Sequence, residues 1–317
     1  MKTFLNDLKN ELIKHKVDME EIVDIIHDHQ EMIEQAISEG LSEDQIPLRF
    51  GQPKELAREL AGQSKKENVK IERDGYTQWK DIQVEGETLK LNISLVSQDV
   101  IVQISEDDHI HIFYKGKDRI DDYRFSYEHG VLKLEAPKSV GFLFMRSRSD
   151  DMSFIIEIPE HLKVDEVKVN VVSSDLVFNA IDSDNFQLNT TSGDVNLTSA
   201  TLGYVKLHTV SGDLKVSQCQ VDTVETSQVS GDLSLEDVKI KNVLKVRTVS
   251  GDVDFESCEA NEVELSAVSG DMRGKEFYPK TITFKSVSGD LDIKNEKQTE
   301  IHVVKKSTLS GEITIKS

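Results

Sequence analysis

The chain has 317 residues and is strongly acidic: 38 Lys and Arg residues stand against 58 Asp and Glu residues, a formal net charge of −20 at pH 7. This balance argues against a nucleic-acid or anionic-membrane surface, because both partners require a basic patch. Only 6% of the residues are aromatic, which disfavours a large aromatic-lined ligand pocket. No apolar run reaches 18 residues, so no integral membrane segment is predicted.

The length suits two or three domains, and composition shifts place their boundaries. We expect a helical domain at 1–62, a linker at 63–85, an irregular β region at 86–170 and a β-repeat domain at 171–317. The first eight residues lack the pattern of a secretory signal, because charges interrupt the apolar residues. The default localisation is therefore cytoplasmic, with cell-envelope association or surface exposure as the alternative.

The first domain, residues 1–62, is predicted to be all helical. Apolar residues recur at helical spacing from position 4 to position 13. A second helix is expected to end at Gly40, a residue favoured just beyond helix C-termini. Pro53 suits the first position of a last short helix, which is expected to end at Gly62.

Three sequence stretches link this domain to a known family: FLNDLKNEL at the start, an acidic middle helix, and EGLSEDQIPLRFGQPKELAREL at 39–60. With these stretches the domain resembles the HAAS helical signalling domain of bacteria. In that family the module is often joined to membrane segments and encoded beside transcription regulators. The resemblance implies a protein partner for residues 1–62, either a regulator or a membrane protein, with self-association as a further option.

The middle of the chain reads as a polar linker at 63–85, turning into a first strand, followed by irregular strands. The strand candidates are LKLNISLV, DVIVQI, HIHIFYKG, VLKLEAP and MSFIIEIP. Their uneven spacing predicts a β region, 86–170, that caps the first face of the repeat domain. His109 and His111 would share one strand face beside Asp107, but no third ligand is evident, so no metal site is predicted.

The C-terminal part contains a sequence repeat. Seven Ser-Gly-Asp or Ser-Gly-Glu corners recur with their glycines 19 to 22 residues apart, and a degenerate copy, Ser173-Ser174-Asp175, precedes them. Apolar residues alternate with polar ones on both sides of each corner, which is typical of strands. One inward column, seven residues before each glycine, runs from Phe186 to Val304. A fixed period of this length indicates a stacked repeat architecture.

The corners form the candidate site of this chain. Glycine supplies a positive φ, and the neighbouring Ser and Asp can hydrogen-bond to the turn backbone. We expect these residues to stack into a ladder that is structural and that also offers a contact for a cation or a partner. The ladder residues are Gly193, Asp194, Gly212, Asp213, Gly231, Asp232, Gly251, Asp252, Gly270, Asp271, Gly289, Asp290, Gly311 and Glu312.

One repeat unit cannot fold alone. About six inward side chains contribute roughly 1.5–3 kcal/mol each, whereas ordering each of its residues costs about 1–2 kcal/mol. The units must therefore stack, about 4.8 Å apart. The predicted fold class is mainly β: a parallel β-solenoid of about seven to eight two-strand rungs, with a small all-α N-terminal domain. Gly274 and Pro279 interrupt the pattern and predict a bulge or loop.

The two cysteines follow the same repeat. Cys219 and Cys258 occupy equivalent positions two rungs apart, about 9.6 Å on that spacing. This separation exceeds the reach of a disulfide. We therefore expect buried free thiols, which suit a reducing compartment.

The phased corners resemble those of the bacterial putative-adhesin family of SGD-turn β-strand repeats, a domain of unknown function. The resemblance spans about 85–317 and is specific over 173–317. Some members of the family resemble surface proteins or proteins that respond to envelope stress. No catalytic residues are defined for the family, so none is assigned here.

These observations predict a non-enzymatic interaction or scaffold protein, linked to cell-envelope stress sensing or surface adhesion, that needs no cofactor. Two alternatives remain open. The first is a structural solenoid that binds calcium along its Asp column. The second is a solenoid-type carbohydrate-active enzyme, which would need clustered carboxylates with Arg or Lys in a groove. An acidic residue repeated in every rung is more typical of turn structure than of such a cluster.

Overall fold

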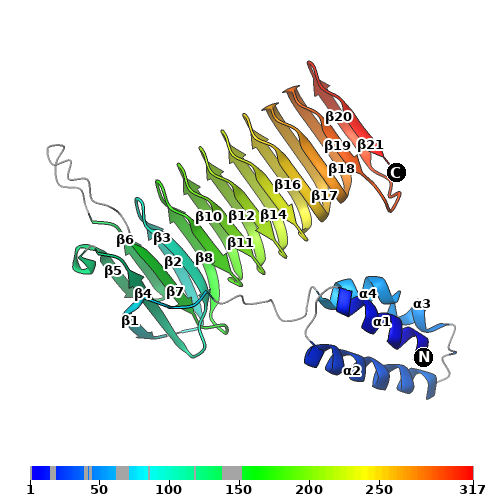
Figure 1. Ribbon diagram of the computed structural model, residues 1–317, viewed down its shortest axis with the longest axis horizontal. Coiled ribbons are helices and arrows are strands. Elements are labelled where there is room, and N and C mark those ends of the chain that lie inside the picture. Colours follow the sequence, from blue (N-terminus) through cyan, green and yellow to red (C-terminus); the bar gives the residue numbers. More distant parts are fainter. Residues whose placement is uncertain are drawn as a thin grey trace. The chain divides into compact units, whose positions relative to one another are not determined.

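A computed structural model of the chain (Figure 1) describes residues 2–14, 19–38, 42, 45–61, 71–84, 86–117, 119–137 and 152–316. The chain divides into two compact units, Met1–Glu67 and Asn68–Ser317. The first is helical and the second is built from β-strands.

The helical unit packs around a small apolar core. Its helices are α1 (Lys2–Lys14), α2 (Met19–Ser38), α3 (Ile46–Phe50) and α4 (Pro53–Ala61). Just before α3, the side-chain oxygen of Gln45 accepts a hydrogen bond from the backbone N–H of Ser42 at 3.3 Å. The helix ends expected at Gly40 and Gly62 lie outside the described residues. The buried core residues are Phe4, Leu5, Leu8, Leu12, Ile22, Ile33, Ile46 and Ala57.

The second unit confirms the predicted fold class: it is a parallel β-solenoid, mainly β (Figure 1). Each rung has a long strand and a short strand, joined by a Ser-Gly-Asp corner. The long strands include β8 (Lys163–Asn170), β10 (Ser183–Thr190), β12 (Thr201–Thr209), β14 (Gln220–Gln228), β16 (Lys239–Thr248) and β20 (His302–Thr308). The short strands include β9 (Leu176–Asn179), β11 (Val195–Thr198), β13 (Leu214–Ser217), β15 (Leu233–Glu236), β19 (Leu291–Lys294) and β21 (Ile313–Lys316).

Two longer strands cross from one rung into the next without a break. They are β17 (Val253–Ser269) and β18 (Met272–Ser288), which pair in parallel. Their register is continuous from Met272 to Ser288, so the bulge predicted from Gly274 and Pro279 is wrong. A Cβ on Gly274 would come within 2.9 Å of Phe277, whose ring stacks on Phe255 at 4.3 Å. Glycine at this inward position therefore makes room for a larger neighbour.

The solenoid begins with strands that do not follow chain order. β2 (Thr88–Ser94) and β3 (Asp99–Ile104) form a rung that pairs with β8 and β9 on one side. On the other side it pairs in parallel with β6 (Val131–Glu135) and β7 (Ser153–Ile158), which come later in the chain. The antiparallel strands β5 (Arg124–Glu128), β4 (His109–Lys115) and β1 (Thr77–Gln83) then pair beyond β6 and β7. Strand β1 lies in the range assigned to a linker from the sequence.

The interior is formed by the apolar columns expected from the repeat. Phe186, Val205 and Val224 are almost fully buried, and so are their counterparts in the next rungs. Cys219 and Cys258 are buried free thiols, as predicted. The last rung differs: Val304 is 67% exposed, because the register shifts within β20 and Val303 takes its pairing position. The prediction of an inward Val304 is therefore wrong.

Candidate functional site

The glycines of the Ser-Gly-Asp corners stack on one another from rung to rung. In Gly193, Gly212, Gly231, Gly251 and Gly270, φ lies between 101° and 138°, a range that side chains rarely tolerate. A Cβ built on Gly231 would lie 2.3 Å from the carbonyl oxygen of Gly212 in the preceding rung. These corners therefore exclude a side chain for two separate reasons, backbone conformation and the close approach of the next rung.

Two of the corners show which of these two reasons applies to all of them. Gly289 and Gly311 lie outside the left-handed φ range, so the positive φ expected from the sequence is absent there. A Cβ on either residue would still come within 2.3 Å of the carbonyl oxygen of the glycine one rung earlier. Close approach of the backbones is therefore the reason for glycine that all of these corners share.

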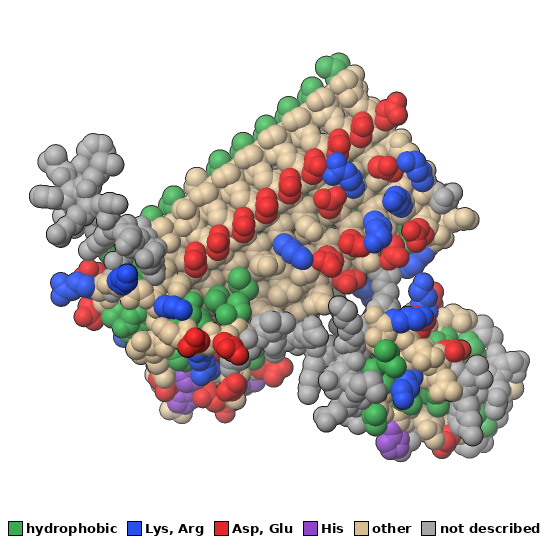
Figure 2. Space-filling model, in the orientation of Figure 1, with side chains coloured by type: hydrophobic (Ala, Val, Ile, Leu, Met, Phe, Trp, Pro, Cys, Tyr) green, Lys and Arg blue, Asp and Glu red, His purple; other side chains and the backbone are tan. Residues whose placement is uncertain are grey.

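The acidic residues after the glycines form a continuous chain of hydrogen bonds. The backbone N–H of each one donates to Oδ1 of the aspartate one rung earlier, at 2.8 to 3.1 Å. The chain begins where Asp99 accepts the N–H of Asp175, and it ends where Asp290 accepts the N–H of Glu312. Figure 2 shows the corresponding row of acidic side chains along one face of the solenoid. The fold itself thus uses one oxygen of each accepting carboxylate.

The serines of the corners also connect successive rungs. The hydroxyl of Ser230 donates to the carbonyl oxygen of Val210 at 3.3 Å, and equivalent serines do the same. Residues preceding these serines form a row of exposed side chains, mostly valine, such as Val229 and Val249. This row is the hydrophobic edge of the solenoid in Figure 2. Acidic and apolar rows therefore run in parallel along the solenoid.

The pKa of Asp252, one residue of this ladder, is shifted. Its pKa lies below the usual value, first because it accepts the N–H of Asp271 and second because Arg273 donates to it. Arg273 lies 2.7 Å from Asp252 and 3.2 Å from Asp271. Burial raises the pKa of the nearby Asp254. Arg273 is thus a local counterion to this part of the acidic row.

The opposite corner of each rung has no glycine. A single residue there takes φ between 52° and 59° in six rungs, and its type differs from one rung to the next. This range is the small left-handed region that L-residues can occupy. This corner could not be predicted from the sequence, because no single residue type marks it in every rung. The residues in the left-handed region at this corner are Ala180, Ser199, Gln218, Asp237, Ser257 and Glu276.

A groove of about 970 Å³ runs along the start of the long strands, from β8 to the residues just before β20. Its floor is a column of almost fully buried residues that includes Leu202, Val221 and Ile240. The walls are the polar residues on either side of this column. The strand register shifts just after Val221 and Ile240, where β16 has one more residue than β14 and β17. No single residue type marks these wall positions in every rung, so the groove was not predicted from the sequence.

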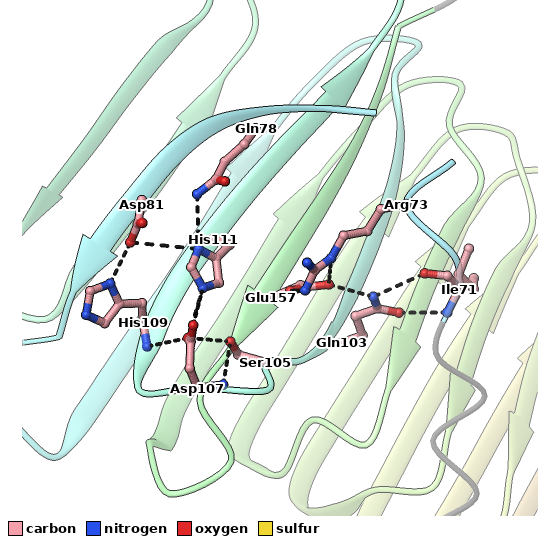
Figure 3. A network of polar contacts seen from close by, with 10 residues as sticks. All are labelled: Ile71, Arg73, Gln78, Asp81, Gln103, Ser105, Asp107, His109, His111 and Glu157. Atoms are coloured by element: carbon pink, nitrogen blue, oxygen red, sulfur yellow. Dashed lines mark hydrogen bonds and ion pairs between the residues drawn. The ribbon is translucent and has the colours of Figure 1, made fainter. Parts of the chain in front are cut away.

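A second polar site lies at the N-terminal end of the solenoid, where β4 pairs antiparallel with β7 (Figure 3). Glu157 of β7 is fully buried within an apolar strand. Arg73 donates to both of its oxygens, at 2.9 and 2.5 Å, and Gln103 donates to it at 3.0 Å. Gln103 also accepts the N–H of Ile71 at 3.0 Å. The network thus fastens the segment before β1 to strands β3 and β7.

Two histidines lie beside this network, each with a carboxylate partner (Figure 3). His109 lies 2.5 Å from Asp81, which raises the pKa of His109. His111 lies 2.8 Å from Asp107. The pKa of Asp107 falls to about 2, first because it accepts the N–H of His109 and then because of His111. The rings of His109 and His111 stack at 6.0 Å, as their predicted shared face requires.

Among the described residues, no group of three or more His, Cys, Asp or Glu side chains could hold a metal ion. Across the same part of the chain, no helix is long and apolar enough to cross a membrane. The structure therefore brings the ladder residues together as a column. It separates that column from the groove, since no ladder residue lines the groove.

Two family models match the chain. The model described as Toastrack DUF4097 matches residues 88–242 and 210–317, and the HAAS model matches residues 3–59. A search of curated proteins finds no significant match. The Toastrack matches cover the strands from β2 onward, and the HAAS match covers the helical unit.

Solved structures share the β architecture at low sequence identity. A "putative adhesin" from Parabacteroides merdae ATCC 43184 is 15% identical, with a TM-score of 0.53 over 76% of this chain and 96% of that chain. A "putative lipid binding protein" from Parabacteroides distasonis ATCC 8503 is also 15% identical, with a TM-score of 0.48 over 76% of this chain and 94% of that one. At this identity, the first likeness supports the fold alone.

Proposed function

Because the chain belongs to the Toastrack DUF4097 family, we propose that it is a non-enzymatic binding protein of the bacterial cell envelope. Its solenoid presents a long, stiff surface to an envelope component. The observation that carries this proposal is the groove, which crosses successive rungs and has a continuous buried floor. A site that extends along the stack suits an elongated ligand better than a small substrate held at one point.

The Ser-Gly-Asp ladder supports the proposal in a different way. Its oxygens accept N–H groups of the next rung, so they hold the rungs at fixed spacing. A rigid site loses little conformational entropy when it binds, which favours affinity. We infer that the ladder stabilises the surface and that the groove provides the contact.

The helical unit supplies a second contact in this proposal. Residues 3–59 match the HAAS model, and the unit has its own apolar core. We propose that it binds a regulator or a membrane protein, so that occupancy of the solenoid is reported to that partner. Self-association through the same unit is the alternative. Envelope stress sensing is the role that this division of labour supports best.

The proposal is tested by co-sedimentation with washed bacterial envelopes, separated into membrane and cell-wall fractions. We expect saturable binding of the full chain, and of residues 68–317 after their fold has been verified by circular dichroism. An unrelated protein of similar size and net charge is the control. Binding that does not exceed this control would contradict the proposal, and capture only by other copies of the chain would favour a self-assembling structural protein.

A further inference from the structure

The charges of the groove are sorted along its length. The half nearer the N-terminal end of the solenoid has three aspartates and one lysine, and the other half has four lysines and two glutamates. Each half therefore carries an excess of two charges, of opposite sign. The residues of the first half are Lys163, Asp182, Asp184 and Asp222, and those of the second are Lys239, Lys241, Glu259, Lys280, Lys297 and Glu300.

Ion pairs inside the groove leave this separation in place. Lys163 pairs with Asp184 at 2.6 Å, within the acidic half. Lys241 pairs with Asp222 at 3.5 Å, across the border between the halves. In the basic half, Lys239 and Lys280 form no ion pair with another described residue. The groove is therefore acidic toward one end and basic toward the other.

Rung spacing gives the distance between the two charged ends. Asp182 and Lys239 lie three rungs apart, and Asp182 and Lys280 lie five rungs apart. At about 4.8 Å per rung these separations are about 14 and 24 Å. An extended peptide covers about 3.3 Å per residue, so four to seven residues would span them.

We propose that the groove binds a short extended peptide with a cationic group at one end and an anionic group at the other, about four to seven residues apart. This inference rests on the proposed function and names the ligand class of the same groove. The cationic end lies in the acidic half and the anionic end in the basic half. The strands cross the groove, and their backbone N–H and C=O groups already pair with neighbouring rungs. The peptide is therefore recognised by side chains and not by strand addition.

A peptide fits the lining better than a glycan does. Sugar rings stack on exposed aromatic faces, and among the described residues that line the groove only Tyr278 is aromatic. Lys297 lies over that ring, 4.6 Å from its centre, and the side chain of Lys297 also pairs with Glu259 at 3.7 Å. A polymer with one sign of charge would be attracted by one half and repelled by the other.

The probe is the hexapeptide Lys-Ala-Ser-Ser-Ala-Glu with free termini, titrated by calorimetry into the full chain. The comparison peptide, Ala-Ser-Lys-Glu-Ser-Ala with both termini blocked, keeps the two charged side chains but places them side by side. We expect the first peptide to bind at least about tenfold more tightly, with affinity that falls as salt rises. A neutral sugar, chitohexaose, serves as the glycan comparison.

Charge reversals in the groove provide the decisive variants. Asp184→Lys with Asp222→Lys makes both halves basic, and Lys239→Glu with Lys280→Glu makes both halves acidic. Each double variant is expected to weaken binding of the hexapeptide about tenfold. The four substitutions together reverse the polarity, so the peptide can enter in the opposite direction and affinity is restored. Lys206→Glu with Lys285→Glu is the matched control, because both lysines lie outside the groove.

Equal binding of the two peptides, tighter binding of chitohexaose, or no loss in the half-reversed variants would overturn the inference. Melting temperatures of the variants identify any that fail to fold, and the four-fold variant gives a gain of binding that damage cannot produce. The envelope co-sedimentation assay is repeated with the half-reversed variants. Undiminished envelope binding without peptide binding would refute the peptide inference and leave the proposed function standing.

Discussion

In most rungs both corners turn the chain through left-handed backbone, yet they accept different residues. At the Ser-Gly-Asp corner, φ reaches 101° in Gly231, and the carbonyl of Gly212 occupies the place of a side chain. At the opposite corner, φ is 54° in Gln218 and 59° in Ala180. The difference shows that glycine is required where successive backbones approach closely, and that left-handed φ near 55° alone does not require it.

The largest effect is expected from Gly231→Ala. The added Cβ would clash with a backbone oxygen and would also place alanine at an unfavourable φ. We expect a loss of about 3 kcal/mol in the free energy of unfolding, measured by urea denaturation. Gly289→Ala carries the clash without the φ penalty, so a smaller loss is expected. If Gly231→Ala were as stable as the unsubstituted chain, the close backbone approach would not require glycine at this corner.

A smaller loss is expected from Asp213→Ala at the same corner. The substitution removes the acceptor of the Asp232 N–H, a hydrogen bond of 2.8 Å, which is worth about 1 kcal/mol. Asp213→Asn keeps a carbonyl oxygen in the same place and should lose less. Chemical denaturation of the two variants separates the hydrogen bond from the charge. If asparagine were as damaging as alanine, charge and not geometry would hold the ladder together.

Acid should weaken the glycine corner near Arg273. The pKa of Asp252 is lower in the folded chain than its ordinary value. Its carboxylate therefore stabilises the fold above the ordinary pKa, and this contribution is lost as pH falls through the lower folded value. Arg273→Gln removes one cause of the shift, so melting temperatures recorded between about pH 2 and 6 should depend less on pH. An unchanged pH dependence would exclude this ion pair as a contributor.

The opposite corner should respond only slightly to Gln218→Gly. Glycine relieves the left-handed backbone of a side chain. It also increases the entropy of the unfolded chain and removes the hydrogen bond that the Gln218 side-chain oxygen accepts from Ser199 at 3.1 Å, so the opposing effects nearly cancel. We expect a change within about 0.5 kcal/mol in urea denaturation. A loss comparable with that of Gly231→Ala would show that the Gln218 side chain itself stabilises this corner.

Calcium is expected to have the smallest effect. One oxygen of each accepting aspartate is already bound to an N–H group, so the ladder offers few oxygens for a cation. We expect the melting temperature to rise by less than about 1 °C with millimolar Ca²⁺, against an EDTA control. A rise of several degrees would support the calcium-binding alternative and would assign the ladder a ligand.

Much of the solenoid could be predicted because every rung has the same structural requirements. Each rung needs the same inward columns, so Phe186 and Val205 identify their positions by phase. The other corner recurs as a backbone conformation and not as a residue type, which leaves no sequence signal. The placement of β6 and β7 beneath β2 and β3 reverses chain order, which periodicity cannot reveal.

The polar features outside the ladder were harder to predict. Glu157 is a single acid inside an apolar strand, and that isolation was the available signal for a buried partner such as Arg73. The groove walls belong to positions such as Lys239 and Asp222, whose charges vary between rungs. Their importance depends on how the stacked rungs bring them into one groove, a property of three-dimensional packing.

The direction of the aspartate ladder has a consequence for biosynthesis. From the rung of Asp194 onward, each carboxylate receives the N–H of a residue only 19 to 22 positions later in the chain. The first link, from Asp99 to Asp175, spans 76 residues, which include strands β4 to β8. During synthesis this long-range link must therefore form first, and it forms slowly. Each later stretch of about twenty residues then pairs with a rung that has already folded.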